Sequence, residues 1–164
     1  MPTIECLIVQ GDRLLLARQS DDLVDGILHP ISGRVEPGEV PLHACIRVVL
    51  KEAGAHLSPS CAAVILNEAP NEGAGYRLVF VAELPASSVV DHRSESALEW
   101  VPVSQLNSTA ALSSLNRELL PKVLAAAAPL AVVLETLVDG SRAIQEVSPF
   151  DPARLSPLVF AVTD

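Results

Sequence analysis

The chain is short of positive charge. Its 164 residues include only two lysines, Lys51 and Lys122, and 11 Lys and Arg residues against 20 Asp and Glu residues give a net charge of −9. A field of this sign repels nucleic-acid backbones and anionic membranes, so a polyanionic small ligand needs a metal ion or a local group of cations. Aromatic residues are also scarce, at 3%, which leaves little to stack on single strands. We therefore expect neither a nucleic acid polymer nor a membrane as partner.

Long apolar runs and patterned cysteines are also missing. No apolar run reaches the ~20 residues that a membrane span needs, and the nearest, VLAAAAPLAVVLETLV, contains Pro129 and Glu135. The N-terminus has no basic stretch ahead of a continuous apolar run, so we expect a cytoplasmic protein. The three cysteines Cys6, Cys45 and Cys61 lie in apolar surroundings without metal-ligand spacing, which predicts reduced, buried thiols.

Apolar residues make up 49% of the chain, enough for a folded core, and the length favours one domain over residues 1–164. Alternating apolar residues and turn signals predict hairpin strands over 4–9 and 13–17, strands over 60–69 and 76–84, a short strand over 98–101, and a hairpin around Asp139-Gly140. A helix is expected over about 114–127. The C-terminal strands, from about residue 129, either extend the sheet or form a dimer contact. The fold class expected is therefore α/β.

A second helix is predicted over residues 41–53. Pro41 suits a first helical turn and Gly54 suits the residue after a helix end. The apolar residues recur at helical spacing, which defines the buried face as Leu42, Cys45, Ile46, Val49 and Ala53.

The loop before this helix, GRVEPGE, places two glycines and two carboxylates, Glu36 and Glu39, where backbone and side chains can approach a ligand. Positions 48, 51 and 52 of the helix stand at i, i+3 and i+4, so we expect them to share a face roughly opposite part of the core stripe. Three carboxylates on such a face would bind hard divalent cations. Here Val48 and Lys51 accompany Glu52.

Residues 33–55 resemble the Nudix box of the Nudix hydrolase family. That box runs glycine, five residues, glutamate, seven residues, arginine, glutamate, an aliphatic, any residue, two glutamates, any residue, glycine and an aliphatic. Six residues fall in register: Gly33, Glu39, Arg47, Val49, Glu52 and Gly54. Val48 and Lys51 replace two of the three helix glutamates, and Ala55 is a weak aliphatic. The resemblance covers about residues 3–127.

The resemblance implies a Nudix fold, in which a mixed β-sheet lies between helices. It also implies hydrolysis of a nucleoside diphosphate linked to another group, with Mg²⁺ or Mn²⁺ held by the box glutamates. Carried over by position, Glu52 is a metal-binding glutamate, Arg47 orients the carboxylates through an ion pair, and Glu39 is the loop glutamate; these three form the catalytic set. The expected metal ligands are Glu52, Glu36 and Glu95, and the expected phosphate-binding residues are Arg34, Lys51 and Arg18, with Arg77 as a further candidate.

The two departures leave several functions open. Without carboxylates at 48 and 51 the multi-metal site should not form, although Glu52 and a loop carboxylate could still hold one Mg²⁺, which needs few protein ligands. The first hypothesis is therefore a divergent pyrophosphohydrolase of nucleoside di- or triphosphate derivatives with weak or altered activity. In a second, Lys51 bonds a diphosphate in place of the metal, or simply pairs with Glu52, Glu39 or Glu36. The rival class is a silent nucleotide-binding or protein-interaction module, and a homodimer is possible.

Overall fold

The computed structural model describes residues 2–18, 26–68, 75–91 and 97–151. Within these ranges the strands are β1 (Thr3–Gln10), β2 (Arg13–Arg18), β3 (Leu28–His29), β4 (Ile31–Arg34), β5 (Ser60–Glu68), β6 (Gly75–Glu83), β7 (Ala97–Pro102), β8 (Leu130–Thr136) and β9 (Arg142–Pro149). The helices are α1 (Pro41–Ala53), the 3-10 helix η1 (Val103–Ser108) and α2 (Ser114–Ala125). The hairpins and both helices predicted from the sequence are confirmed.

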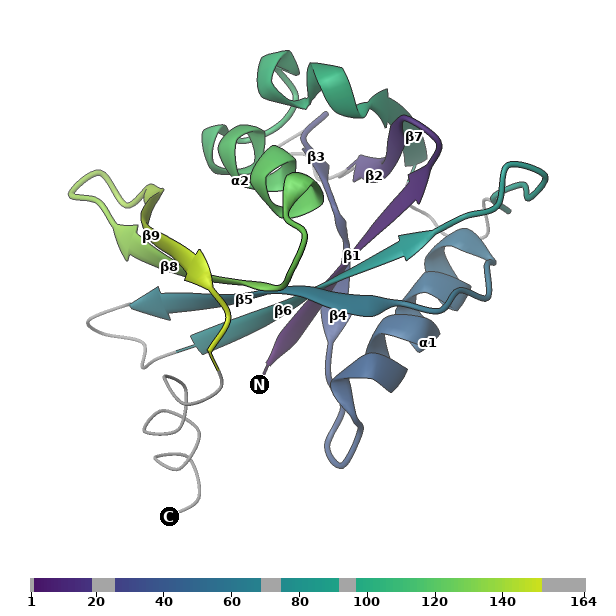
Figure 1. The fold of residues 1–164 in the computed structure, drawn as a ribbon, viewed down its shortest axis with the longest axis horizontal. Coiled ribbons are helices and arrows are strands. Elements are labelled where there is room, and N and C mark those ends of the chain that lie inside the picture. The colour runs from purple at the N-terminus through teal and green to yellow at the C-terminus, as the bar shows by residue number, and fades with distance from the viewer. Residues whose placement is uncertain (1, 19–25, 69–74, 92–96, 152–164) are drawn as a thin grey trace.

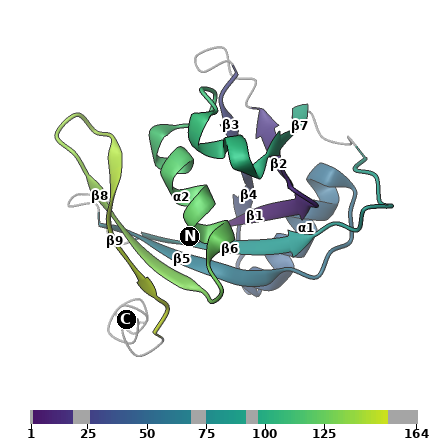
Figure 2. The same ribbon diagram turned by 45° about the horizontal axis from the view of Figure 1, so that its top comes forward.

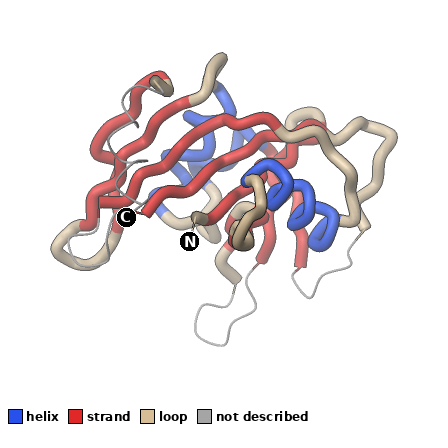
Figure 3. The backbone as a smooth tube through the Cα atoms, turned by 90° about the horizontal axis from the view of Figure 1, so that it is seen from below, coloured by secondary structure: helices blue, strands red, loops and turns tan. Residues whose placement is uncertain are grey.

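The strands form one mixed sheet with a helix on each face, as Figures 1 and 3 show. Its main path runs β3-β2-β1-β6-β5-β8-β9, with β4 also paired to β1 and β7 to β2. β1 is antiparallel to β2 and β4 but parallel to β6. The expected α/β class, with a mixed sheet between helices, is therefore confirmed.

Strand alternation builds two cores. Successive side chains of a strand point to opposite faces, so in β1 the residues Ile4, Cys6 and Ile8 pack on the side of α1. Leu7 joins the core on the other face, which α2 covers. β1 thus contributes side chains to both cores, one on each face of the sheet. The core on the Ile4 face holds α1 against the sheet.

Helix α1 has the predicted ends but a different buried face. Gly54 follows it with a left-handed φ of 63°, and its N–H donates to the Leu50 carbonyl at 3.0 Å, a helix end that glycine tolerates best. Val48 is only 6% exposed and belongs to the α1 core, whereas Leu42 is 37% exposed. The prediction that Leu42 lies in the core stripe, with Val48 on an outward face, is wrong because the sheet lies under the Val48 side of the helix.

The C-terminal strands lie in the main sheet. β8 pairs in parallel with β5, and β9 pairs antiparallel with β8. Figure 2 shows this hairpin at the end of the sheet away from α1. Helix α2 precedes it, with the Ser113 hydroxyl accepting a hydrogen bond from the Asn116 N–H at 3.1 Å as a helix N-cap.

The structure also bears on the cysteines and on the membrane-span expectation. Cys6 and Cys45 are buried, but Cys61 is exposed, so the prediction of three buried thiols is wrong for Cys61. It lies near the start of β5, next to the register shift between Cys61 and Ala63. Among the described residues no helix combines the length and the apolar character that crossing a membrane requires.

Candidate nucleotide site at the Nudix-like box

The loop between β4 and α1 is a compact turn. The Glu39 N–H donates to the Glu36 carbonyl at 3.0 Å, and the Glu36 N–H donates to the Glu39 carboxylate, also at 3.0 Å. Gly38 adopts a positive φ of 78° between them, a conformation that glycine accepts without strain. The loop carboxylates are thus set by the turn itself.

Arg47 ties this loop to the helix. Its guanidinium donates to both oxygens of Glu39, with Nε 2.8 Å from one and Nη2 2.9 Å from the other. Nη2 also donates to the Arg34 carbonyl at 3.0 Å, and Nη1 lies 3.7 Å from a Glu36 oxygen. The two-pronged geometry is the strong form of an arginine–carboxylate pair. Arg47 therefore holds β4, the loop and α1 in one arrangement.

This contact changes the acid strength of the loop glutamate. The hydrogen bonds from Arg47, and then that from the Glu36 N–H, lower the pKa of Glu39 from its ordinary value to about 2. Glu39 is consequently ionised at any pH where the protein would be used. With its oxygens taken by Arg47 and the turn, it acts here as part of the frame of the loop.

Val48 occupies the space above the box glycine. A Cβ added to Gly33 would lie 2.5 Å from the Val48 Cγ2, closer than carbon atoms can pack. Since Val48 is buried in the α1 core, an apolar contact replaces the carboxylate that the family pattern has at this position. Gly33 and Val48 thus form a matched pair.

The other two positions of the expected face differ in environment. Lys51 is exposed and Glu52 is partly buried. Neither is in an ion pair with a residue in the described ranges. The expected pairing of Lys51 with Glu52, Glu39 or Glu36 is therefore not formed in this structure.

These residues do not fit the multi-metal site that the family pattern implies. Hard divalent cations need several oxygen ligands, but position 48 offers methyl groups packed on Gly33 and position 51 offers a cation. Of the two loop carboxylates, Glu39 is committed to Arg47 and Glu36 lies beside the same guanidinium. Of the carboxylates of the box, Glu52 is the one without an ion pair to a described residue.

A pocket of about 370 Å³ lies beside the box on the face of the sheet opposite α1; its described lining residues are Thr3, Ile4, Glu5, Ser32, Gly33, Arg34 and Arg77. Thr3 of β1 pairs with Arg34 on one side and with Arg77 on the other. Two arginines thus flank the end of β1.

Arg77 is anchored in this pocket by a carboxylate. Its Nη1 donates to Glu5 at 2.6 Å, and Glu5 is only 7% exposed. A buried charge is tolerated only when it is paired, so each of these residues requires the other. The sequence reasoning missed Glu5, although a lone acid in the apolar strand TIECLIVQ was the signal that could have found it.

The remaining predicted site residues lie elsewhere. Arg18 donates to the Gly26 carbonyl at 2.8 Å and pairs with Glu99 at 2.5 Å, and it is not among the described lining residues of the box pocket. Glu95 lies outside the described residues. The structure therefore brings Arg47, Glu39, Glu36 and Arg34 together around the box, and places Arg18 in a different contact.

Solved structures of similar fold support this reading of the architecture. The MutT protein of Bacillus halodurans superposes with a TM-score of 0.71 at 18% identity, covering 90% of this chain and 95% of that one. The dihydroneopterin triphosphate pyrophosphohydrolase of E. coli gives 0.60 at 23% identity, covering 76% and 96%. The NUDIX domain of Shewanella oneidensis NrtR, solved with ADP-ribose, gives 0.61 at 12% identity, covering 76% and 85%. At these identities the likeness shows the fold alone.

Comparison of sequences identifies the family to which the chain belongs. Among curated protein sequences, none matches this chain significantly. The family model described as NUDIX domain matches residues 1–123, which include β1 through most of α2 and the whole box. The chain belongs to the Nudix family.

Proposed function

We propose that this protein binds a nucleoside di- or triphosphate derivative in the box pocket and has lost the multi-metal hydrolysis of that ligand. The observation that carries the proposal is the packing of Val48 on Gly33. It puts a buried apolar side chain at a position where the family pattern has a glutamate, so the loss is built into the core.

The cations of the pocket support the binding half of the proposal. Arg34 is exposed and is in no ion pair within the described part of the chain. Arg77 is held at 2.6 Å by Glu5, and a guanidinium has further N–H donors to offer. Arginine suits phosphate because its planar fork can make two parallel hydrogen bonds. In a chain of net charge −9, such local cations are what an anionic ligand needs.

The solved relatives indicate the ligand class. One is named as a triphosphate pyrophosphohydrolase, and another was solved with ADP-ribose. Both names involve a chain of phosphates attached to a larger organic group. We extend that class to this chain as a proposal, with Lys51 on the exposed flank of α1 as an alternative phosphate contact.

A second candidate function is weak hydrolysis with a single metal ion. Glu52 favours it, because it is partly buried and is in no ion pair with a described residue. Mg²⁺ can be held by one or two carboxylates when water and substrate phosphates complete its shell.

One experiment separates the two candidates. Binding of ADP, ATP and ADP-ribose is measured by calorimetry with EDTA and with Mg²⁺, and product release is followed for the wild type and for the Val48→Glu, Lys51→Glu double variant. We expect the wild type to bind without metal and to release nothing. The double variant places a carboxylate in the core against Gly33, so circular dichroism first checks that it folds; phosphate release with Mg²⁺ by the folded variant would show that positions 48 and 51 account for the loss. Metal-dependent turnover by the wild type that Glu52→Gln abolishes would establish the second candidate instead. Failure to bind any of the three ligands would overturn the proposal.

A further inference from the structure

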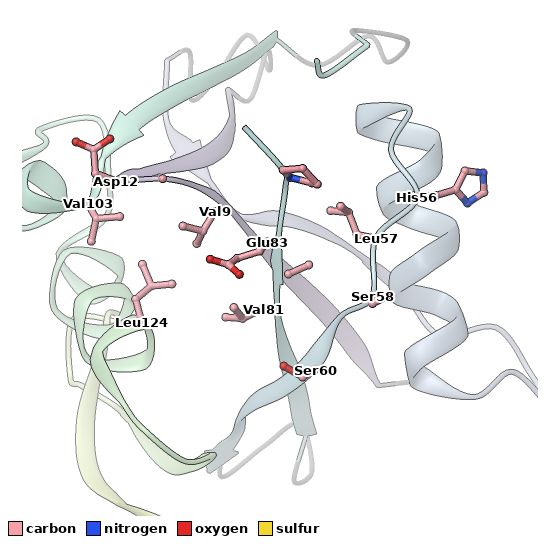
Figure 4. Close-up of a pocket in the computed structure, with 13 residues that line it drawn as sticks. Val9, Asp12, His56, Leu57, Ser58, Ser60, Val81, Glu83, Val103 and Leu124 are labelled. Atoms are coloured by element: carbon pink, nitrogen blue, oxygen red, sulfur yellow. The ribbon is translucent and has the colours of Figure 1, made fainter. Parts of the chain in front are cut away.

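A larger cavity lies at the other end of the same sheet face. Its volume is about 930 Å³, within the range of small-molecule sites. The β1–β2 turn, the segment between α1 and β5, the facing ends of β5 and β6, and helix α2 surround it, as Figure 4 shows. It begins at Val9, six residues along β1 from Thr3 of the box pocket. Glu5, which also lines the box pocket, is four residues from Val9, so at ~3.3 Å per residue the nearest lining residues on β1 are about 13 Å apart.

The inner wall of this cavity is apolar. Val9 and Val81 come from neighbouring strands, and Val103 and Leu124 approach from η1 and α2. All four are partly buried against the α2 core. They leave an apolar floor open to a ligand.

One carboxylate reaches into this floor. In Figure 4 the side chain of Glu83 lies between Val9 and Val81 with its oxygens directed toward Leu124, while Asp12 and His56 point away. Glu83 is exposed and is in none of the ion pairs formed by described residues. Of the two described carboxylates that line the cavity, Glu83 is therefore the one directed over the apolar surface, and Asp12 lies at the rim.

The described residues that line the cavity include no lysine or arginine. The nearest arginine in sequence, Arg13, is engaged elsewhere, since it donates to the Gln10 side chain at 3.2 Å and lies 5.1 Å from the centre of the Trp100 ring. An anionic ligand would find hydroxyl donors, from Ser58 and Ser60, but no permanent cation among these lining groups. A neutral apolar ligand would remove the Glu83 carboxylate from water without compensation.

We propose that this cavity is a second ligand site, which binds a small organic amine. Its apolar body lies on Val9, Val81 and Leu124, and its ammonium pairs with the Glu83 carboxylate. An ion pair beside apolar surface is stronger than one in open water because fewer water molecules screen it. The site is independent of the function proposed for the box pocket.

The test uses three probes with the same six-carbon chain: hexylamine, hexanoate and hexanol. Each is titrated into the full-length protein, and amide shifts in the NMR spectrum report where it binds. We expect hexylamine to shift the amides of Val9, Val81 and Leu124, and hexanoate at the same concentration to leave them unchanged. Glu83→Gln should weaken hexylamine about tenfold, and because Glu83 is exposed the variant should stay folded.

Asp12→Asn is the matched control, because it removes a rim carboxylate that points away from the cavity. It should change hexylamine affinity much less than Glu83→Gln does. Equal binding of hexanoate and hexylamine, or unchanged affinity in Glu83→Gln, would overturn the proposal. So would a dimer in sedimentation that Leu124→Glu breaks, because the face would then be covered by a second copy of the chain.

Discussion

The two ends of one sheet face carry opposite chemistry. On β6, Arg77 and Glu83 are six residues apart and point to the same face; Arg77 lies in the box pocket and Glu83 in the second cavity. Their separation of about 20 Å exceeds the ~8 Å over which salt screens exposed charges. The charge at one end should therefore have little effect on a ligand bound at the other.

The strongest test of the box end removes its anchored cation. Arg77→Met leaves the Glu5 carboxylate buried without a partner, which should lower the free energy of unfolding by about 3 kcal/mol. Urea denaturation measures the loss. A second variant, Arg77→Met with Glu5→Gln, should recover much of it; if it does not, the pair is not what stabilises this end.

The box end also differs from the second cavity in its packing, because Val48 lies directly on Gly33. A second test addresses this contact. Gly33→Ala would drive a methyl group into Val48, at a cost of about 2 kcal/mol for overpacking. Thermal unfolding of Gly33→Ala, Val48→Ala and the double variant forms a mutant cycle. We expect the double variant to be more stable than the sum of the single effects predicts. Strict additivity would contradict the close contact.

The independence of the two ends can be tested by exchanging ligands. Arg34→Ala should weaken nucleotide binding about tenfold by removing a charged hydrogen bond and leave hexylamine affinity unchanged. Glu83→Gln should weaken hexylamine binding and leave nucleotide affinity unchanged. Calorimetry with both ligands on both variants checks this, and a variant that weakens both would show that the ends are coupled.

The smallest expected effect concerns the loop glutamate. The pKa of Glu39 is lowered to about 2 in the folded protein, so its ion pair contributes stability above its ordinary pKa and loses it as pH falls toward 2. The difference in unfolding free energy between wild type and Glu39→Gln should be constant from pH 7 to 5 and then shrink below about 4.5. A constant difference down to pH 3 would mean that Arg47 does not bind the carboxylate.

Much of the fold followed from local patterns. The ends of α1 were predictable because Pro41 and Gly54 act through backbone geometry alone, and the glycine does adopt a left-handed φ. The hairpin at Asp139-Gly140 was predictable for the same reason, since Gly140 has a positive φ of 81°. Such signals need no knowledge of distant contacts.

The site was less predictable because it depends on contacts between distant segments. Helical spacing alone could not decide whether Leu42 or Val48 faces the sheet. The deciding residue is Gly33 of β4, which has no side chain and so leaves room for Val48. In the same way the pairing of Glu5 with Arg77 requires β1 and β6 to be parallel neighbours. The sequence showed the family pattern and its two departures, and the register of the sheet showed what the departures touch.

The contacts of Arg47 with Glu39 and the Arg34 carbonyl have a consequence for the protein without metal. They hold the loop and helix together by bonds within the chain, so the shape of the box does not depend on a bound cation. Restoring a carboxylate at position 48 would bury it against Gly33, so the frame alone does not make a metal site.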